Sequence, residues 1–274
     1  VSIIKAKKII LVGDQNQLPA YADAEVSPTL AKLTKNPDYR LFDILYNSLP
    51  DTHKQILTTQ YRMIENIGNL ISKVFYRGII DTGCNDDEKR HGLNRYVGKS
   101  IVWFDTSANK KKSQKRTKGG SYINEEEKRI ILEILDDLKS TGELKGLDIG
   151  IITGYSGQKE LLRKSIKATG LDKIASKIDI NTLDAFQGRE NDIIIYSTVR
   201  TRDSIGFQKE KERVNVAFSR AKKLLIVCGD KNFFYNFDDQ DNKFVEIIDY
   251  ISEGEECEII QCDGGKLFER ESNS

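Results

Sequence analysis

Five short polar runs of this chain carry the side chains that could do chemistry. Each lies beside an apolar segment, and the runs are Gly13 to Pro19 (GDQNQLP), Gln60 to Met63 (QYRM), Ile152 to Gln158 (ITGYSGQ), Asp184 to Glu190 (DAFQGRE) and Asn215 to Lys222 (NVAFSRAK). The arginines among them are permanently charged and present a planar fork of donors that matches phosphate. The amides both donate and accept hydrogen bonds. Residues of these types suit the binding of phosphate and sugar oxygens.

The elements that must position these runs alternate along the chain. Short β-branched segments that end in glycine or polar clusters predict strands at residues 9–12, 101–104, 149–153, 178–182, 192–198 and 224–228. Apolar residues at helical spacing predict a helix at about 124–140, and shorter patterns predict helices at 41–47, at 66–74 and from residue 156. Because strands and helices alternate, we predict an α/β fold with a parallel sheet and crossover helices.

Composition limits the function classes without selecting a partner. The chain has 43 Lys and Arg residues against 42 Asp and Glu residues, a formal net charge of +1, so a site for an anionic partner must be local. No apolar run reaches the ~18 residues of a membrane helix, and no leader pattern opens the chain, so we expect a cytoplasmic protein with no membrane contact. Four cysteines without C-x-x-C spacing and two histidines argue against a zinc site and against a disulfide framework.

In their order and spacing, the polar runs resemble the C-terminal motor half of superfamily 1 helicases, in the 5′→3′ branch that includes senataxin and the nonsense-mediated-decay helicase. Two further runs, FYRG at 75–78 and SYINEEE at 121–127, belong to the same pattern, which extends from about Lys8 to Asp230. The resemblance implies a RecA-like three-layer sandwich of the P-loop NTPase type, with a mostly parallel sheet. It also implies an ATP-dependent helicase or translocase that acts on single-stranded DNA or RNA.

The resemblance and the composition together imply a domain organisation. Residues 1–50 would be the trailing strand and connector of a first RecA-like domain, residues 51–252 a second RecA-like domain, and residues 253–274 an acidic and polar tail. Residues 109–120 (NKKKSQKRTKGG) are strongly basic and almost devoid of apolar side chains, so we expect a mobile loop there. This loop would either add salt-dependent affinity for nucleic acid or be simply solvated.

Hydrolysis of a nucleotide γ-phosphate spreads negative charge over the phosphoryl oxygens, so catalysis consists largely of positioning and charge neutralisation. By resemblance, Arg62 and Arg220 are arginine fingers, and Gln17 senses the γ-phosphate and its water. The resemblance further implies four ATP-binding residues: Asp14, Tyr61, Gly188 and Glu190. Glu190 would hold the ribose hydroxyls, whereas Tyr61 would be either a stacking surface for the nucleotide or a packed interface aromatic.

A motor that tracks a strand needs contacts to phosphates and sugars that ignore sequence. Thr153, Tyr155 and Gln158 follow one predicted strand and Thr182 ends another, so all four should lie at the same edge of the sheet. By resemblance these residues grip the backbone of a single strand. Asn124 either belongs to the same surface or is the N-cap of the helix that follows it.

ATP hydrolysis also requires a glycine-rich phosphate cradle and an acidic pair for Mg²⁺. Neither pattern occurs in the chain: Gly98-Lys99-Ser100 is preceded by Gly92 one residue too far away. In the family that the chain resembles, both lie before GDQNQLP, so we expect them in an N-terminal motor domain upstream of Val1. We therefore expect ATP and Mg²⁺ to bind the full-length protein, the isolated chain to be inactive as an ATPase, and no metal site within it.

Two other functions fit parts of the pattern. The chain could belong to a binding module that kept the motor fold and lost catalysis, which the upstream sequence would reveal. A nuclease would need an Asp…Glu-x-Lys cluster, but the obvious Glu-x-Lys, Glu126 to Lys128, falls on a predicted helix. The choice between DNA and RNA rests on a few contacts that a sequence does not locate.

Overall fold

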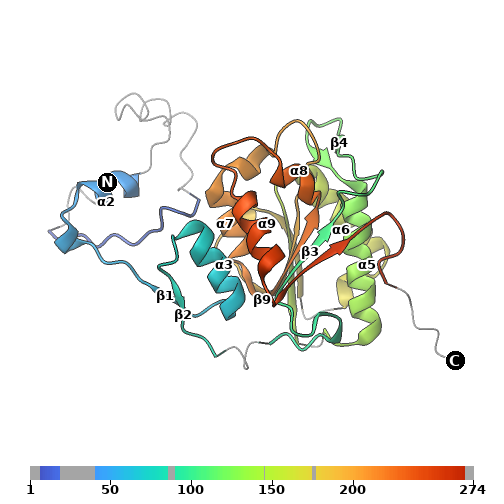
Figure 1. Ribbon diagram of the computed structural model, residues 1–274, viewed down its shortest axis with the longest axis horizontal. Coiled ribbons are helices and arrows are strands. Elements are labelled where there is room, and N and C mark those ends of the chain that lie inside the picture. Colours follow the sequence, from blue (N-terminus) through green and yellow to red (C-terminus); the bar gives the residue numbers. More distant parts are fainter. Residues whose placement is uncertain (1–6, 19–40, 86–89, 145, 175–176, 269–274) are drawn as a thin grey trace. The chain divides into compact units, whose positions relative to one another are not determined.

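The computed structural model describes residues 7–18, 41–85, 90–144, 146–174 and 177–268 (Figure 1). It divides into two compact units, Val1–Leu57 and Thr58–Ser274. The division at Leu57 lies close to the boundary expected at residue 50. Each unit has its own elements and is described separately.

The first unit contains helix α2 (Leu41–Ser48) and a short 3-10 helix, η2 (Asp51–His53). The rings of Phe42 and Tyr46 stack within α2, with centroids 5.9 Å apart. The strand predicted at 9–12 is wrong, because these residues have no regular secondary structure, and Ile10 and Val12 are 81% and 89% exposed. A strand requires a hydrogen-bonded neighbour, and the described residues of this unit supply none.

The second unit is built on a parallel sheet with the strand order β10-β3-β9-β8-β6-β7 among the described residues. Its strands are β3 (Ile101–Asp105), β6 (Asp148–Thr153), β7 (Lys177–Thr182), β8 (Asn191–Ser197), β9 (Ala221–Gly229) and β10 (Cys257–Gln261). The predicted strands at 101–104, 149–153, 178–182, 192–198 and 224–228 are thereby confirmed. So is the predicted α/β, RecA-like three-layer fold with a mostly parallel sheet.

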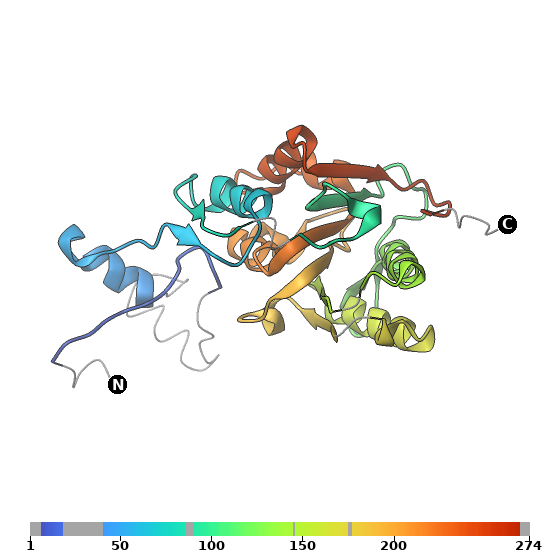
Figure 2. The same ribbon diagram turned by 90° about the horizontal axis from the view of Figure 1, so that it is seen from below.

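Helices cover both faces of this sheet (Figure 2). One layer consists of α5 (Glu125–Thr141) and α6 (Ser156–Ala168), and the other of α3 (Glu65–Phe75), α7 (Lys211–Phe218), α8 (Lys231–Tyr235) and α9 (Phe244–Glu253). Alternate residues of β8 face the two layers: Ile193 and Ile195 join the core under α5, and Tyr196 packs on Phe218 of α7 with ring centroids 5.5 Å apart. No described helix is both long and apolar enough to cross a membrane.

The second unit also contains shorter strands and 3-10 turns outside the central sheet. β1 (Thr59–Gln60) pairs with β2 (Asp81–Thr82), and 3-10 turns occur at η3 (Asn94–Tyr96), η4 (Leu171–Lys173), η5 (Asp184–Phe186) and η6 (Gly206–Lys209). The mobile loop predicted at 109–120 is wrong, because β4 (Lys115–Arg116) and β5 (Tyr122–Ile123) form an antiparallel hairpin within and beside it. Gln114, which is 2% exposed, supplies the buried contact that the composition of this segment concealed.

The segment expected to be an acidic and polar tail, 253–274, contributes to the sheet instead. Residues Cys257 to Gln261 form β10, which pairs with the whole of β3. Just beyond it, the backbone N–H of Cys262 donates to the carbonyl of Asp105 at 2.8 Å, and the ring of Phe268 meets Phe104 edge-on. The net acidity of the segment hid its short apolar run, Ile259-Ile260, which suffices for an edge strand.

Gly150, in the middle of β6, offers a test of how tightly the sheet packs. A β-carbon there would lie 2.6 Å from Cδ1 of Ile194 and 2.7 Å from Cζ of Phe186. Gly150→Ala should therefore lower the free energy of unfolding by about 1–3 kcal/mol through overpacking, measured by urea denaturation. Gly119→Ala is the matched control, because nothing lies within 4 Å of its added methyl group. Equal unfolding midpoints for the two variants would contradict the packing described here.

Candidate functional site

Because every strand of the sheet points the same way, the amino ends of the strands share one edge and the carboxyl ends share the other. The predicted ATP-binding residues of the second unit lie at the amino edge, around the starts of β8 and β9. The predicted nucleic-acid-binding residues lie at the carboxyl edge, around the ends of β6 and β7. β8 connects the two edges over seven residues, a length of about 20 Å.

At the amino edge, three segments that are distant in sequence meet through Arg62, which contacts Glu190 and Ser219. The Nε of Arg62 donates to Oε2 of Glu190 at 2.6 Å, and its Nη1 donates to the carbonyl oxygen of Ser219 at 3.2 Å. Both charged side chains are partly exposed, Arg62 at 35% and Glu190 at 47%. The predicted finger and the predicted ribose-binding carboxylate are therefore brought together, and both can reach solvent.

Arg220 approaches the same point from inside the protein and is only 2% exposed. Its Nε donates to the carbonyl of Val216 at 2.9 Å, its Nη1 to the carbonyl of Arg189 at 3.3 Å, and its Nη2 to Oγ of Ser219 at 3.4 Å. The backbone N–H of Asn191, at the start of β8, donates to the carbonyl of Arg220 at 3.1 Å. These contacts fix the guanidinium group at the end of α7.

Tyr61 and Gly188 stand next to this cluster in the sequence. The side chain of Tyr61 is 69% exposed, and its ring lies close to Gly83, where a β-carbon would come within 2.5 Å. Gly188 has φ +79, a left-handed conformation that glycine adopts without strain. The turn at Gly188 leads the chain from η5 to Arg189 and Glu190 at the start of β8.

The remaining predicted residues of this group, Asp14 and Gln17, lie in the first unit. Oδ1 of Asp14 accepts from the backbone N–H of Asn16 at 2.9 Å, and Oδ2 accepts from Nε2 of Gln17 at 2.9 Å. The run GDQNQ thus forms a turn closed by the Asp14 side chain, an arrangement typical of aspartate. The turn holds the Gln17 amide against a carboxylate.

At the carboxyl edge, the predicted neighbours Thr153 and Thr182 are direct partners in the β6–β7 register. Thr153 is fully buried, Thr182 is half-buried, and Tyr155 is 4% exposed. The ring of Tyr155 lies between those of Tyr122 and Phe207, with centroids at 5.6 and 5.7 Å. Of the predicted strand-gripping residues, Thr182 is thus the one with a partly accessible side chain.

Asn124 and Gln158 are fully buried and bind each other and the backbone. Oδ1 of Asn124 accepts from the backbone N–H groups of Glu126 and Glu127, both at 3.1 Å, which makes it the N-cap of α5. Oε1 of Gln158 accepts from the backbone N–H of Asn124 at 2.8 Å, and its Nε2 donates to Oγ of Ser197 at 3.1 Å. As placed, these two side chains hold α5, α6 and β8 together and present no donor to solvent.

Glu127 lies at the centre of this network and is fully buried. Its carboxylate accepts from Oγ of Ser197 at 2.6 Å and from the backbone N–H of Val199 at 2.9 Å. Burial raises the pKa of Glu127 to about 8, although its hydrogen bonds to Ser197 and Val199 act in the opposite direction. Val199 has φ 69, a left-handed conformation that strains a β-branched residue. Glu127 therefore stabilises a strained turn at the end of β8.

The run SYINEEE belongs to the motif pattern, but the pattern implies no role for Glu127. A signal was present, because Glu127 precedes Ile130 by three residues and Ile131 by four and so falls on the buried stripe of α5. Ser219, where Arg62 and Arg220 meet, had no such signal. Ser219 contacts the two arginines through its backbone carbonyl and its hydroxyl, and the positions of these two groups are set by the fold.

Comparison with known proteins gives concordant matches. The sequence model of the AAA domain family matches residues 38–232. An uncharacterized ATP-dependent helicase of Methanocaldococcus jannaschii is 32% identical over 93% of this chain, which spans 36% of that relative. The helicase SEN1 of Saccharomyces cerevisiae is 34% identical over 81% of the chain, and the ATP-dependent helicase upf1 of Schizosaccharomyces pombe is 32% identical over 83%. The chain spans 10% and 24% of those two proteins.

Among solved structures, the chain is similar to the C-terminal domain of a possible DNA helicase from Lactobacillus plantarum. The match has a TM-score of 0.37 and 16% sequence identity, and it covers 62% of this chain and 88% of that domain.

The raised pKa of Glu127 predicts a dependence of stability on pH. Between the ordinary carboxyl pKa of 4.5 and about 8, the folded chain holds a proton that the unfolded chain has released, so stability falls as pH rises. Relative to Glu127→Gln, the unaltered chain should lose up to about 1.4 kcal/mol of unfolding free energy per pH unit in this window. Urea denaturation from pH 5 to 9 measures the difference, with Glu125→Gln as the control for removing one charge from α5. A difference that does not vary with pH would contradict the prediction.

Proposed function

Since the chain belongs to the senataxin- and Upf1-like superfamily 1 helicases, within the AAA domain family, we propose that it is the C-terminal motor domain of an ATP-dependent nucleic-acid helicase or translocase. The observation that carries the proposal is the convergence of Arg62, Glu190 and Arg220 at the amino edge of the sheet, from three separate segments. The chain spans about a third or less of the three relatives named above, so other parts of such a protein would complete the enzyme.

In this proposal Arg62 and Glu190 meet the nucleotide at the partly exposed side of the cluster. The Glu190 carboxylate is an acceptor suited to ribose hydroxyls, and the Arg62 fork is suited to phosphate. Their mutual ion pair, at 2.6 Å, keeps both groups oriented before a nucleotide arrives. Asp14, Tyr61 and Gly188 are proposed as further ATP-binding residues, with Gln17 as the γ-phosphate sensor.

Arg220 is proposed as the second finger. Because its guanidinium group is 2% exposed and donates to two carbonyls and a hydroxyl, it must exchange at least one of these acceptors for a phosphate oxygen. The weakest are the contacts at 3.3 and 3.4 Å, to Arg189 and Ser219. Both belong to the loops that carry Glu190 and Arg220, so nucleotide binding and release of Arg220 would be linked.

At the carboxyl edge, the proposed partner is a single strand of DNA or RNA. Thr153, Tyr155, Gln158, Thr182 and Asn124 are the residues proposed for that interface. Burial divides their roles: Thr182 has a partly accessible side chain, whereas Asn124 and Gln158 would position the turns on which strand contacts are made. Since Glu190 precedes β8 and Ser197 ends it, this strand is a direct physical link between the proposed ATP and strand sites.

Substitution of either proposed finger tests the proposal in the intact parent protein. Arg62→Ala and Arg220→Ala should each lower the ATP hydrolysis rate by about 10³-fold, because each removes a fixed positive charge from the γ-phosphate. Affinity for a single-stranded oligonucleotide should stay within about threefold, since these residues lie at the opposite edge of the sheet.

Arg95→Ala is the control, because Arg95 pairs with Asp137 on the outside of α5. Loss of strand binding equal to the loss of hydrolysis would refute the finger roles. An intact parent without ATPase activity that still binds single strands would instead identify a binding module that kept only the motor fold.

The 274 residues alone provide a second test. They contain no glycine-rich phosphate cradle, so we expect the purified chain with ATP and Mg²⁺ to release phosphate no faster than buffer. A steady-state phosphate-release assay measures this. Activity above background that is lost in Arg220→Ala would overturn the expectation and place a complete ATP site within this chain.

A further inference from the structure

An exposed aromatic ring that belongs to none of the sequence motifs lies at the carboxyl edge. Phe207, in η6, is 50% exposed, and its ring lies 5.7 Å from that of Tyr155. Tyr155 in turn meets Tyr122 of β5 at 5.6 Å. The three rings form a row from the half-exposed Phe207 to the β4–β5 hairpin, and the guanidinium group of Arg213 lies 5.2 Å from the centre of the Phe207 ring.

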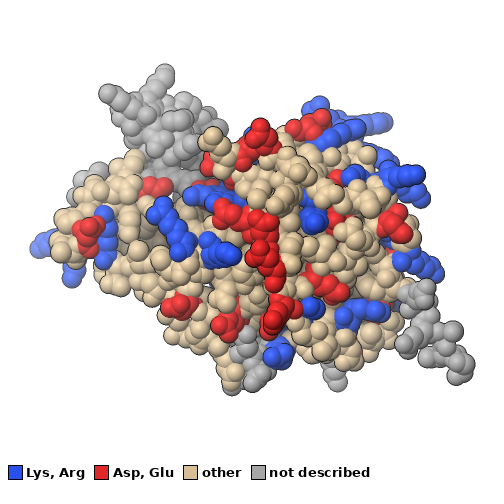
Figure 3. Space-filling model, viewed as in Figure 1, with Lys and Arg blue, Asp and Glu red and all other residues tan. Residues whose placement is uncertain are grey.

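The hairpin at the other end of this row is strongly basic. Lys110, Lys111, Lys115, Arg116 and Lys118 are all exposed, and none has a carboxylate within ion-pair distance in the described part of the chain. In Figure 3 a group of blue side chains stands out at the edge of the molecule where Figure 1 labels β4. Cations left without internal partners retain their full attraction for an external anion.

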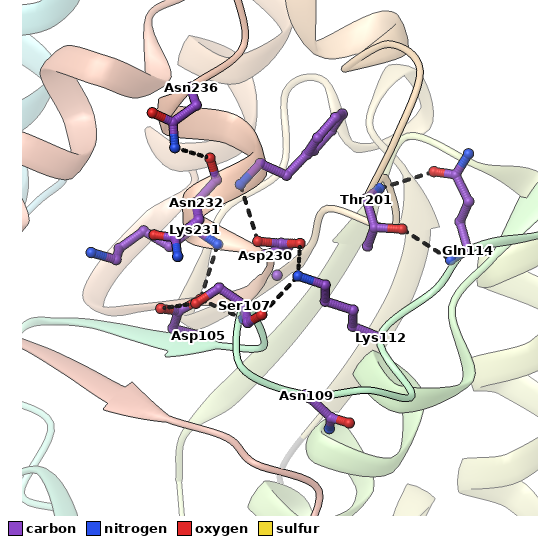
Figure 4. A network of polar contacts seen from close by, with 12 residues as sticks. Asp105, Ser107, Asn109, Lys112, Gln114, Thr201, Asp230, Lys231, Asn232 and Asn236 are labelled. Carbon is purple, nitrogen blue, oxygen red and sulfur yellow. Dashed lines mark hydrogen bonds and ion pairs between the residues drawn. The ribbon is translucent and has the colours of Figure 1, made fainter.

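This hairpin is held in place by contacts at its base (Figure 4). Lys112 forms an ion pair with the buried Asp230 at 2.7 Å, and Gln114 exchanges two hydrogen bonds with Thr201 at 3.1 and 2.9 Å. At its far strand, Oγ of Ser121 accepts from the backbone N–H of Gly157, in the first turn of α6, at 3.0 Å. The basic arm is therefore fixed beside the residues that end β6.

Between the hairpin and α6 lies an open groove of about 410 Å³. Its lining is mostly apolar and includes three hydroxyl groups and one charge of each sign: Thr117, Ser121, Ser156, Lys164 and Glu160. The guanidinium group of Arg200 lies 4.2 Å above the ring of Tyr122 and is 5% exposed. In the described residues it has no ion-pair partner. Its positive charge therefore lies beside β5 of the hairpin.

We propose that Phe207 and the β4–β5 hairpin form one binding track for single-stranded nucleic acid, in which a base stacks on Phe207 and the following phosphates lie along Lys115, Arg116 and Lys118. This inference rests on the proposed function and extends its strand interface to residues outside the helicase motifs. A half-exposed ring favours an unpaired base, because a base in a duplex has no open face to stack on. An acidic protein segment would use the cations but would have no such need for the ring.

The two halves of the track should differ in how their contribution to binding affinity depends on salt concentration, and the experiment uses this difference. Fluorescence anisotropy of a labelled single-stranded 20-mer, DNA and RNA, is measured with the 274-residue chain from about 50 to 300 mM salt. Lys115→Gln/Arg116→Gln/Lys118→Gln should lower the slope of log affinity against log salt by about 2, since each phosphate neutralised on a single strand contributes about 0.7. The matched control, Lys139→Gln/Lys167→Gln/Lys173→Gln, removes three exposed lysines from the last turns of α5 and α6 and from η4, and should leave the slope unchanged.

Phe207→Leu should weaken binding about fivefold or more at every salt concentration without changing the slope, because stacking is lost and charge is not. Phe207→Tyr keeps an aromatic face and should restore the affinity. Urea midpoints of the variants confirm that each is folded.

The outcomes separate this inference from the proposed function. Binding of the unaltered chain with no effect of either variant set overturns the track and leaves a strand interface elsewhere. No binding of any oligonucleotide by the folded chain overturns both the track and the proposed strand interface. A third outcome would also overturn the track. If Phe207→Leu has no effect, and polyglutamate binds as tightly as the single strand or a blunt duplex binds more tightly than it, the hairpin binds a different polyanion.

Discussion

The uniform direction of the strands is the constraint on which the rest of the structure depends. In a parallel sheet every loop that follows a strand opens at one edge and every loop that precedes a strand opens at the other. DAFQGRE therefore crosses from the end of β7 to the start of β8, and NVAFSRAK delivers Arg220 to the start of β9. Two sets of polar side chains that alternate along the sequence are thus separated in space, one at each edge.

Buried polar contacts, rather than surface charge, maintain the carboxyl edge. Asn124, Glu127 and Gln158 have no exposed surface, yet they connect α5, α6 and the end of β8 through hydrogen bonds of 2.6–3.1 Å. An unsatisfied buried carboxylate or amide costs more than its hydrogen bonds return, so these residues are interdependent. The strained turn at Val199 persists because the Glu127 carboxylate accepts a hydrogen bond from the backbone N–H of Val199. That turn positions Arg200 and the segment that leads to Phe207.

The sequence predicted most of the core and less of the candidate site. Strands such as β6 and β8 were predictable because a strand buried on both faces is apolar throughout, and α5 because its stripe repeats at helical spacing. Ile9 to Val12 has the same apolar character but is not a strand here, since strand formation depends on a partner rather than on composition. Thr153 and Thr182 were correctly expected at one edge, because both end a strand.

The motifs do not reveal which of their side chains are buried in the folded protein. Gln158 and Asn124 carry groups suited to binding a strand, and only the fold reveals that those groups are already occupied by protein partners. Conversely, no periodic pattern in the sequence marks Phe207 or the basic hairpin. The structure connects them through the ring of Tyr155, which contacts the rings of Phe207 and of Tyr122 in β5. The hairpin was not predicted because its order comes from two polar residues, Lys112 and Gln114. Their partners are the buried Asp230, just after β9, and the half-buried Thr201, in the loop after β8.

The pairing of β10 with β3 has a practical consequence for anyone who shortens this protein. All five residues of β3 are buried, and β10 satisfies the hydrogen-bonding groups along one side of that strand. A boundary placed at residue 252, where composition suggests that the folded domain ends, would leave β3 as a flat apolar edge. Such an edge is a template for pairing with other chains, so the shortened protein would aggregate although every residue of the helicase motifs remained.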